Sequence, residues 1–162
     1  MSLLQRVSAR LLAPLAILAA IAVGGAALAL ADTGSPNATT ARTVTVQLRH
    51  GSLGRYLVDA RGRTLYLFEK DRGGRSACYG SCASVWPPLV ASGQVARGAG
   101  VSAARLGSVT RRDSRRQVTY GGHTLYFYAG DSRPGQTRGE GLNQFGAKWY
   151  VLAASGSKID RD

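Results

Sequence analysis

The sequence predicts a mostly β protein in which two tandem, hairpin-centred repeats form one compact domain. The first observation is internal repetition, because residues 64–71 (TLYLFEKD) return 60 positions later as 124–131 (TLYFYAGD). The second is the alternation of side chains along several short segments, which is typical of β-strands. The third is that no segment shows a long amphipathic helical period. Repetition at a fixed spacing indicates one supersecondary unit that is used twice.

Six short strands are expected, five of them within the repeats. They span residues 43–48, 56–59, 64–68, 117–120, 123–128 and 148–152. In the first repeat the turn is centred on Gly62, since glycine readily adopts positive φ. In the second repeat the turn is Gly121-Gly122, a two-glycine hairpin turn. The spacing of 60 extends upstream, where it aligns Val58 with Val118 and Gly62 with Gly122.

Both faces of the two return strands, 64–68 and 124–128, carry bulky and largely apolar side chains. Because side chains alternate along a strand, one face holds Leu65, Leu67, Leu125 and Phe127 and the other holds Tyr66, Phe68, Tyr126 and Tyr128. Either these strands are covered on both sides, or their aromatic face meets the partner repeat. Between the repeats, residues 91–100 are expected to form a surface loop and 101–106 one or two helical turns.

The N-terminus has the composition of an export signal. Arg6 and Arg10 precede an uncharged, apolar run at 11–31 that ends Ala29-Leu30-Ala31. A basic start, an apolar run and small residues before a polar one indicate a secretory signal peptide with cleavage after Ala31. The run is also long enough for an uncleaved membrane anchor. Both interpretations leave the remainder outside the cytoplasm, secreted or in the extracytoplasmic cell envelope, because the arginines stay inside.

Composition divides the rest of the chain. Residues 32–42 form a polar linker without hydrophobic periodicity. The tandem-repeat β domain is expected at 43–155 and a tail at 156–162. Within the domain, repeat one covers about 54–90 and repeat two about 115–153.

The chain is strongly basic, with a formal net charge of +12. Such a charge attracts polyanions, so anionic cell-wall or membrane components are the expected partners, and a dedicated partner need not exist. The membrane itself is contacted only through the N-terminal segment if that segment is not cleaved. The densest cluster, 111–116 (RRDSRR), is interpreted as a solvated loop and not as a specific nucleic-acid site, because single-strand readers interleave stacking aromatics with charge. The sequence does not predict the oligomeric state.

The pattern Tyr-x-aromatic-x-x-Asp occurs once in each repeat. Its residues are Tyr66, Phe68 and Asp71 in repeat one and Tyr126, Tyr128 and Asp131 in repeat two. An aspartate just after a strand is expected to accept hydrogen bonds from amides of the next loop. Alternatively, the two aspartates are symmetric ligands or general bases. No catalytic constellation surrounds them, so no enzymatic activity is expected.

The repeated motif and two further stretches resemble a known family. Residues 76–89 (SACYGSCASVWPPL) and 119–126 (TYGGHTLY) are similar to the most recognisable parts of a secreted-repeat family of unknown function, found in bacterial lipoproteins and related exported proteins. The resemblance covers about residues 54–153. It implies export and a tandem repeat, and no established activity. Many relatives are lipoproteins, whereas this chain has no cysteine near the signal that could carry a lipid.

Two cysteines and two tryptophans complete the candidate site residues. Outside the cytoplasm, Cys78 and Cys82 are expected to form a structural disulfide. The alternative is a thiol pair that handles copper or electrons, which would require soft, reduced thiolates. No metal or cofactor is otherwise expected. Trp86 and Trp149 are each expected to cap the core of their own repeat, or else to form an exposed platform for carbohydrate or peptide.

Overall fold

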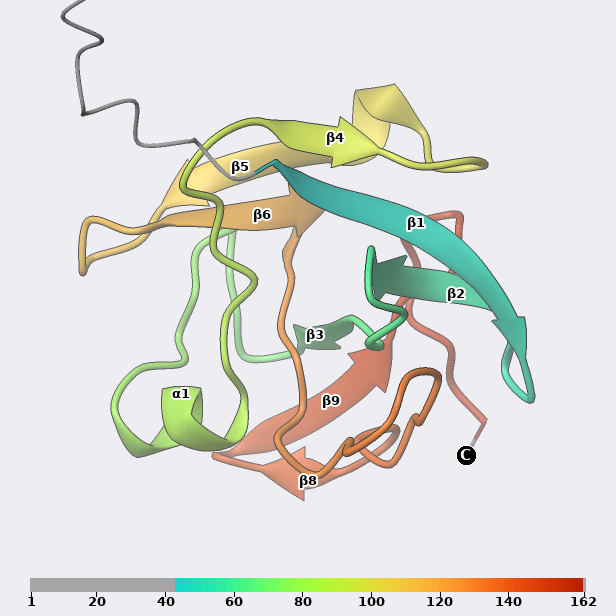
Figure 1. Ribbon diagram of the computed structural model, residues 1–162. Helices are drawn as coiled ribbons and strands as arrows, with labels where there is room; N and C mark the ends of the chain where they lie inside the picture. The colour runs from blue at the N-terminus through green and yellow to red at the C-terminus, as the bar shows by residue number, and fades with distance from the viewer. Residues whose placement is uncertain (1–42, 162) are drawn as a thin grey trace, which may run out of the picture. The chain divides into compact units, whose positions relative to one another are not determined.

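Short β-strands dominate the part of the chain that the computed structural model describes, residues 43–161 (Figure 1). The strands are β1 (Val44–Gly51), β2 (Gly54–Asp59), β3 (Tyr66–Phe68), β4 (Val95–Arg97), β5 (Leu106–Thr110), β6 (Arg116–Tyr120), β7 (His123–Thr124), β8 (Asn143–Gln144) and β9 (Ala147–Val151). The helices are α1 (Ser81–Val85) and a 3₁₀ turn at Ala103–Arg105. The predicted mostly β class is confirmed. The expected signal or anchor and the linker lie outside the described residues.

The strands form three three-stranded sheets, in the orders β2-β1-β4, β3-β9-β8 and β5-β6-β7. All neighbours are antiparallel except β1 and β4, which run parallel. Isolated bridges such as Tyr56 to Ala153 and Val90 to Gln117 link segments outside these ladders. Among residues 43–161, no helix is long and apolar enough to span a membrane.

The two repeats meet where their motif segments cross. Tyr66 donates its backbone N–H to the carbonyl of Tyr126 at 2.9 Å, and Tyr126 returns the same bond to Tyr66 at 3.0 Å. This reciprocal pair is an antiparallel bridge between equivalent residues. The two motif segments are therefore related by a local twofold axis that passes between the tyrosines.

Two hydrophobic clusters pack on opposite faces of these segments. The first, called here the leucine cluster, includes Leu65, Leu67, Leu125, Val118 and Leu152. The second, called here the aromatic cluster, includes Tyr66, Phe68, Tyr126, Trp86 and Trp149. The alternation predicted for the return strands is thus confirmed, and both faces are covered. Full burial of each large apolar side chain contributes about 1.5–3 kcal/mol, so both clusters stabilise the same crossing point.

Several elements differ from the prediction. The expected loop at 91–100 contains β4, whose three residues are too few to show a period and which forms by parallel pairing with β1. The expected helical turns at 101–106 shorten to the 3₁₀ turn, and β5 begins directly after it. The helix α1 was not predicted. Its five residues lie between Gly80, at φ +56°, and Trp86, whose conformation is restricted by the following proline.

The predicted match of Val58 with Val118 is wrong by one residue. The carbonyl of Leu57 accepts the N–H of Leu65, and the carbonyl of Val118 accepts the N–H of Leu125, each at 3.0 Å. Leu57, and not Val58, is therefore the counterpart of Val118. The turn in the first repeat is one residue longer, so the spacing changes before Gly62.

Candidate functional site

The carboxylate of each motif is bound by the tyrosine of the other motif. The Tyr66 hydroxyl donates to Asp131 Oδ2 at 2.6 Å, and the Tyr126 hydroxyl donates to Asp71 Oδ2 at 2.8 Å. The predicted bonds from the following loops are also present, from the amide of Ala77 to Asp71 and that of Arg138 to Asp131. Sequence reasoning missed the exchange between repeats. The equal spacing of Tyr and Asp in both motifs was the only signal for it.

Burial governs the electrostatics of this arrangement. Desolvation raises the pKa of Asp71, while bonds from the Thr124 hydroxyl, the Ala77 amide and the Tyr126 hydroxyl oppose that rise. Desolvation likewise raises the pKa of Asp131, against the bond from Tyr66. The pKa values of both tyrosines are raised as well, chiefly by burial and then by the neighbouring carboxylate. The phenols therefore remain protonated donors at every physiological pH.

Four aromatic rings form a column that alternates between the repeats. Phe68 stacks on Trp149 and Trp149 on Trp86, each pair with ring centroids 4.0 Å apart, and Trp86 packs against Tyr128 at 4.4 Å. Both tryptophans are 0% exposed. Each tryptophan packs edge-to-face on the motif tyrosine of its own repeat, Trp86 on Tyr66 at 5.3 Å and Trp149 on Tyr126 at 5.1 Å, and it also stacks on a motif ring of the other repeat. The alternative of an exposed tryptophan platform is excluded.

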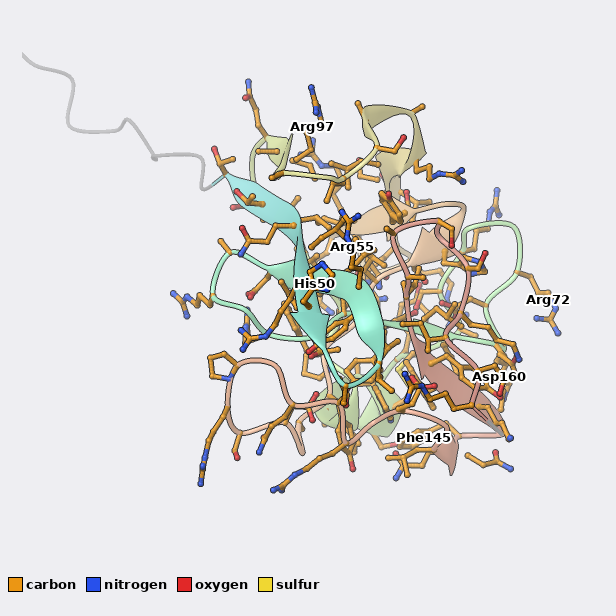
Figure 2. The ribbon with its side chains drawn as sticks, turned by 90° about the vertical axis from the view of Figure 1, so that its right-hand side faces the viewer. His50, Arg55, Arg72, Arg97, Phe145 and Asp160 are labelled. Carbon is orange, nitrogen blue, oxygen red and sulfur yellow. A yellow bond between two sulfur atoms is a disulfide. The ribbon has the colours of Figure 1, made fainter. Side chains whose placement is uncertain are left out.

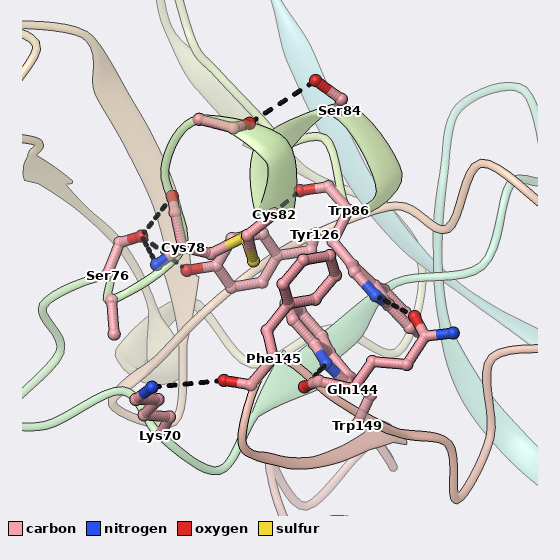
Figure 3. The surroundings of a disulfide bond; sticks show 12 residues. Lys70, Ser76, Cys78, Cys82, Ser84, Trp86, Tyr126, Gln144, Phe145 and Trp149 are labelled. Carbon is pink, nitrogen blue, oxygen red and sulfur yellow. Dashed lines mark hydrogen bonds between the residues drawn. A yellow bond between two sulfur atoms is a disulfide. The ribbon is translucent and has the colours of Figure 1, made fainter.

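Gln144 joins the two tryptophans by hydrogen bonds, as Figure 3 shows. Its side-chain oxygen accepts the indole N–H of Trp86 at 2.9 Å, and its backbone carbonyl accepts that of Trp149 at 3.1 Å. Buried indoles usually have such a partner, since an unpaired N–H would be costly. The hairpin of β8 and β9 is thereby attached to the ring column.

Cys78 and Cys82 form a disulfide, with Cα atoms 5.3 Å apart (Figure 3). Cys78 is 0% exposed and Cys82 6%, and both belong to the aromatic cluster. Within residues 43–161, no group of three His, Cys, Asp or Glu side chains is placed to hold a metal ion. His50 lies exposed on β1, and His123 lies half-buried on β7.

The basic cluster at 111–116 is only partly the solvated loop that was expected. The Arg111 side chain is fully buried and donates to Ser76 Oγ, Gln117 Oε1 and the carbonyl of Cys78 at 2.6–2.8 Å. A guanidinium has five donors, so it can be buried where several acceptors surround it. The remaining residues of the cluster are exposed. Arg111 therefore ties the disulfide loop to β6.

Two clefts lie beside the two motif carboxylates and occupy equivalent places in the repeats. One, of about 490 Å³, is lined by residues that include Phe68, Asp71 and His123. The other, of about 190 Å³, is lined by residues that include Tyr128, Asp131 and Arg63. Arg63 precedes His123 by the repeat spacing of 60, but it is paired with Asp59 at 2.8 Å. At equivalent positions, one cleft therefore has a histidine and the other has an arginine that is paired with an acid.

A third and larger cleft, of about 670 Å³, is called here the basic cleft. It lies between the loop before α1 and the turn that joins β5 to β6. Its lining is Arg75, Ser76, Ala77, Tyr79, Val109, Thr110, Arg111 and Arg112. Three of these residues are arginines, and none is acidic.

Comparison with known proteins agrees with the repeat seen in the structure. A family model described as a secreted repeat of unknown function matches residues 48–90 and again 107–153, together more than half of the chain. No curated protein and no solved structure matches. The predicted resemblance, the tandem organisation and the general expectation of a secreted protein are confirmed. The chain belongs to the secreted-repeat family of unknown function.

Proposed function

We propose that this protein is an exported, non-enzymatic module of the cell envelope that binds anionic envelope components through its basic surface. Membership of a secreted family supports its place outside the cytoplasm. The net charge of +12 supports the class of partner, since a positive surface attracts polyanions. The observation that carries the non-enzymatic part of the proposal is that the tyrosine of each motif binds the carboxylate of the other.

The motif carboxylates serve the fold in this proposal. Asp71 accepts bonds from the Ala77 amide and from the hydroxyls of Tyr126 and Thr124. A general base must reach the proton that it removes from a substrate, but these bonds direct the carboxylate towards its own protein. The polar residues of the two repeated motifs thus hold the repeats together, and the exterior remains for binding.

The alternative of redox or copper chemistry at Cys78 and Cys82 gains no support. Catalytic and redox-sensing thiols are accessible and lie in environments that favour the thiolate. Here the sulfur atoms are joined, and they pack within the aromatic cluster. The disulfide instead supports the extracytoplasmic location, where such bonds persist.

The exposed cations are distributed over several faces, which suits a diffuse attraction. Figure 2 shows Arg55 on the β1–β2 hairpin, with Arg97 and Arg72 on other parts of the surface. Attraction of this kind decreases as salt screens the charges over distances of about 10 Å at moderate ionic strength. Binding to the envelope should therefore depend strongly on salt.

Cosedimentation tests the proposal. The exported protein, purified intact, is mixed with wall fragments of its host and with vesicles that contain anionic lipid, and the bound fraction is measured from low to high salt. We expect binding at low salt to at least one of these materials, with release as salt increases. Absence of binding at low salt would contradict the proposal. So would any turnover that disappears in an Asp71→Asn variant that still folds.

A further inference from the structure

The basic cleft is the place where the positive charge is most organised. The clefts beside Asp71 and Asp131 both include carboxylates, whereas every charged side chain that lines the basic cleft is an arginine. The nearest acid in the sequence, Asp113, does not line it and is paired with Arg115 at 2.8 Å and with Arg111 at 3.2 Å. An anion that enters the cleft therefore meets no carboxylate among the lining residues, although Asp113 already pairs with Arg111 behind them.

Tyr79 holds two of the three arginines at this cleft in position. The guanidinium groups of Arg111 and Arg112 lie over the Tyr79 ring, at 4.3 and 4.2 Å from its centroid. The backbone N–H of Arg112 also donates to the Tyr79 hydroxyl at 3.1 Å. Cation–π contacts of this kind reduce the side-chain freedom that would be lost when a ligand binds. Arg111 is itself buried and fixed by its own hydrogen bonds, so it supports the Tyr79 ring from the protein side while Arg112 lies on that ring at the surface.

We infer that the basic cleft binds a phosphodiester segment of an anionic polymer, an inference that rests on the proposed function. Arginine provides planar, forked donors that match phosphate oxygens, and the exposed hydroxyl of Thr110 adds a shorter polar group. A volume of about 670 Å³ exceeds what a single phosphate needs. It suits several consecutive units of a chain. Arg75 and Arg112 are exposed on this lining and are the residues that contact the polymer.

The test compares two variants of equal charge. Arg75→Gln/Arg112→Gln removes two cations from the cleft, and Arg97→Gln/Arg133→Gln removes two exposed cations that do not line it. The affinity of the intact exported protein and of both variants is measured for a synthetic glycerol phosphate oligomer. Polyglutamate of equal charge and vesicles containing phosphatidylglycerol serve as the comparison ligands. Thermal melting of each variant confirms that the fold is retained.

We expect the cleft variant to bind the oligomer at least about tenfold more weakly, with a salt slope reduced by about one to two units, and the control variant to change by less than about threefold. Equal losses in both variants would overturn the inference and leave the proposed function intact. Equal affinity for polyglutamate would overturn the phosphodiester assignment. Binding to vesicles but not to the oligomer would overturn the assignment to a polymer. If the wild-type protein bound none of these and no wall fragment, the proposed function itself would fail.

Discussion

Tyr66 and Tyr126 are hydrogen-bonded to each other through both backbone amides, at 2.9 and 3.0 Å, while their hydroxyls reach past each other to opposite carboxylates. Each motif therefore supplies the donor for the carboxylate of its partner. A single repeat on its own would contain a tyrosine without its carboxylate acceptor and an aspartate without its tyrosine donor. The spacing of Tyr and Asp in this chain is explained by the contact between repeats, and no ligand is needed to account for it.

Removal of either phenolic hydroxyl is expected to destabilise the domain. In Tyr66→Phe, the half-buried Asp131 loses its hydroxyl donor and keeps the bond from the Arg138 amide, which should lower the free energy of unfolding by about 1–3 kcal/mol. Tyr126→Phe should act similarly on Asp71. Urea denaturation of the purified protein measures both effects.

The chain offers a matched control for this experiment. Tyr128→Phe also removes one hydroxyl, but it places in repeat two the residue that repeat one has at Phe68, and the ring stays in the aromatic column. A change of less than about 0.5 kcal/mol is expected there. If Tyr128→Phe were as destabilising as Tyr66→Phe, the exchange of hydrogen bonds would not be the cause.

Alkaline pH should unfold the protein through the same two tyrosines. Burial, followed by the bond to Asp131, raises the pKa of Tyr66 above its ordinary value of 10.0, and burial with the charge of Asp71 does the same for Tyr126. A group whose folded pKa is raised contributes stability that is fully present below the unfolded pKa and is lost as the pH rises through the folded pKa. The contribution of these two tyrosines to the free energy of unfolding should thus be constant up to about pH 10 and fall above it.

Absorbance at the tyrosinate band and urea denaturation, followed together between neutral and strongly alkaline pH, test this prediction. Tyr66→Phe should have a shallower alkaline decline than the wild type, because one raised pKa is removed. Ionisation of all seven tyrosines near pH 10 in the folded protein would contradict it.

The sequence predicted the class of fold and the alternation of the motif strands because both depend on local patterns. Leu65 and Tyr66 point to opposite clusters simply because they are neighbours in a strand. The exchange between Tyr66 and Asp131 spans 65 positions and was not predictable from local pattern. Burial of Arg111 was missed for the same reason, since its acceptors Ser76 and Cys78 lie on a distant loop.

Loss of the disulfide should destabilise the fold without unfolding it. The crosslink closes a loop of only a few residues, so its restriction of the unfolded chain contributes about 2 kcal/mol. Cys78→Ala/Cys82→Ala avoids the burial of new hydroxyl groups and should lower the free energy of unfolding by that amount. Reductant should destabilise the wild type similarly and leave the variant unchanged. A variant as stable as the oxidised wild type would show that the disulfide has another role.

Substitution of Gly139 measures how tightly the aromatic cluster is packed around Trp86 and Tyr66. This buried glycine lies against two rings of repeat one, and a Cβ placed on it would stand 2.6 Å from Trp86 Cη2 and 2.9 Å from Tyr66 Cε1. Neither ring can move away freely, because Trp86 is stacked on Trp149 and Tyr66 is bonded to Asp131. Gly139→Ala is therefore expected to lower the free energy of unfolding by about 1–3 kcal/mol.

A second substitution identifies the cause of that loss. Trp86→Phe removes the ring atoms nearest to the added methyl group, although it has a cost of its own in the column. If the clash with Trp86 dominates, Gly139→Ala should be less damaging in the Trp86→Phe background than in the wild type, and urea denaturation of the four proteins gives this coupling energy. If the losses caused by Gly139→Ala and Trp86→Phe simply added, the methyl group would be acting on a contact other than Trp86. The backbone N–H of Gly139, which donates to the Tyr66 hydroxyl at 3.3 Å, would then be the first contact to examine.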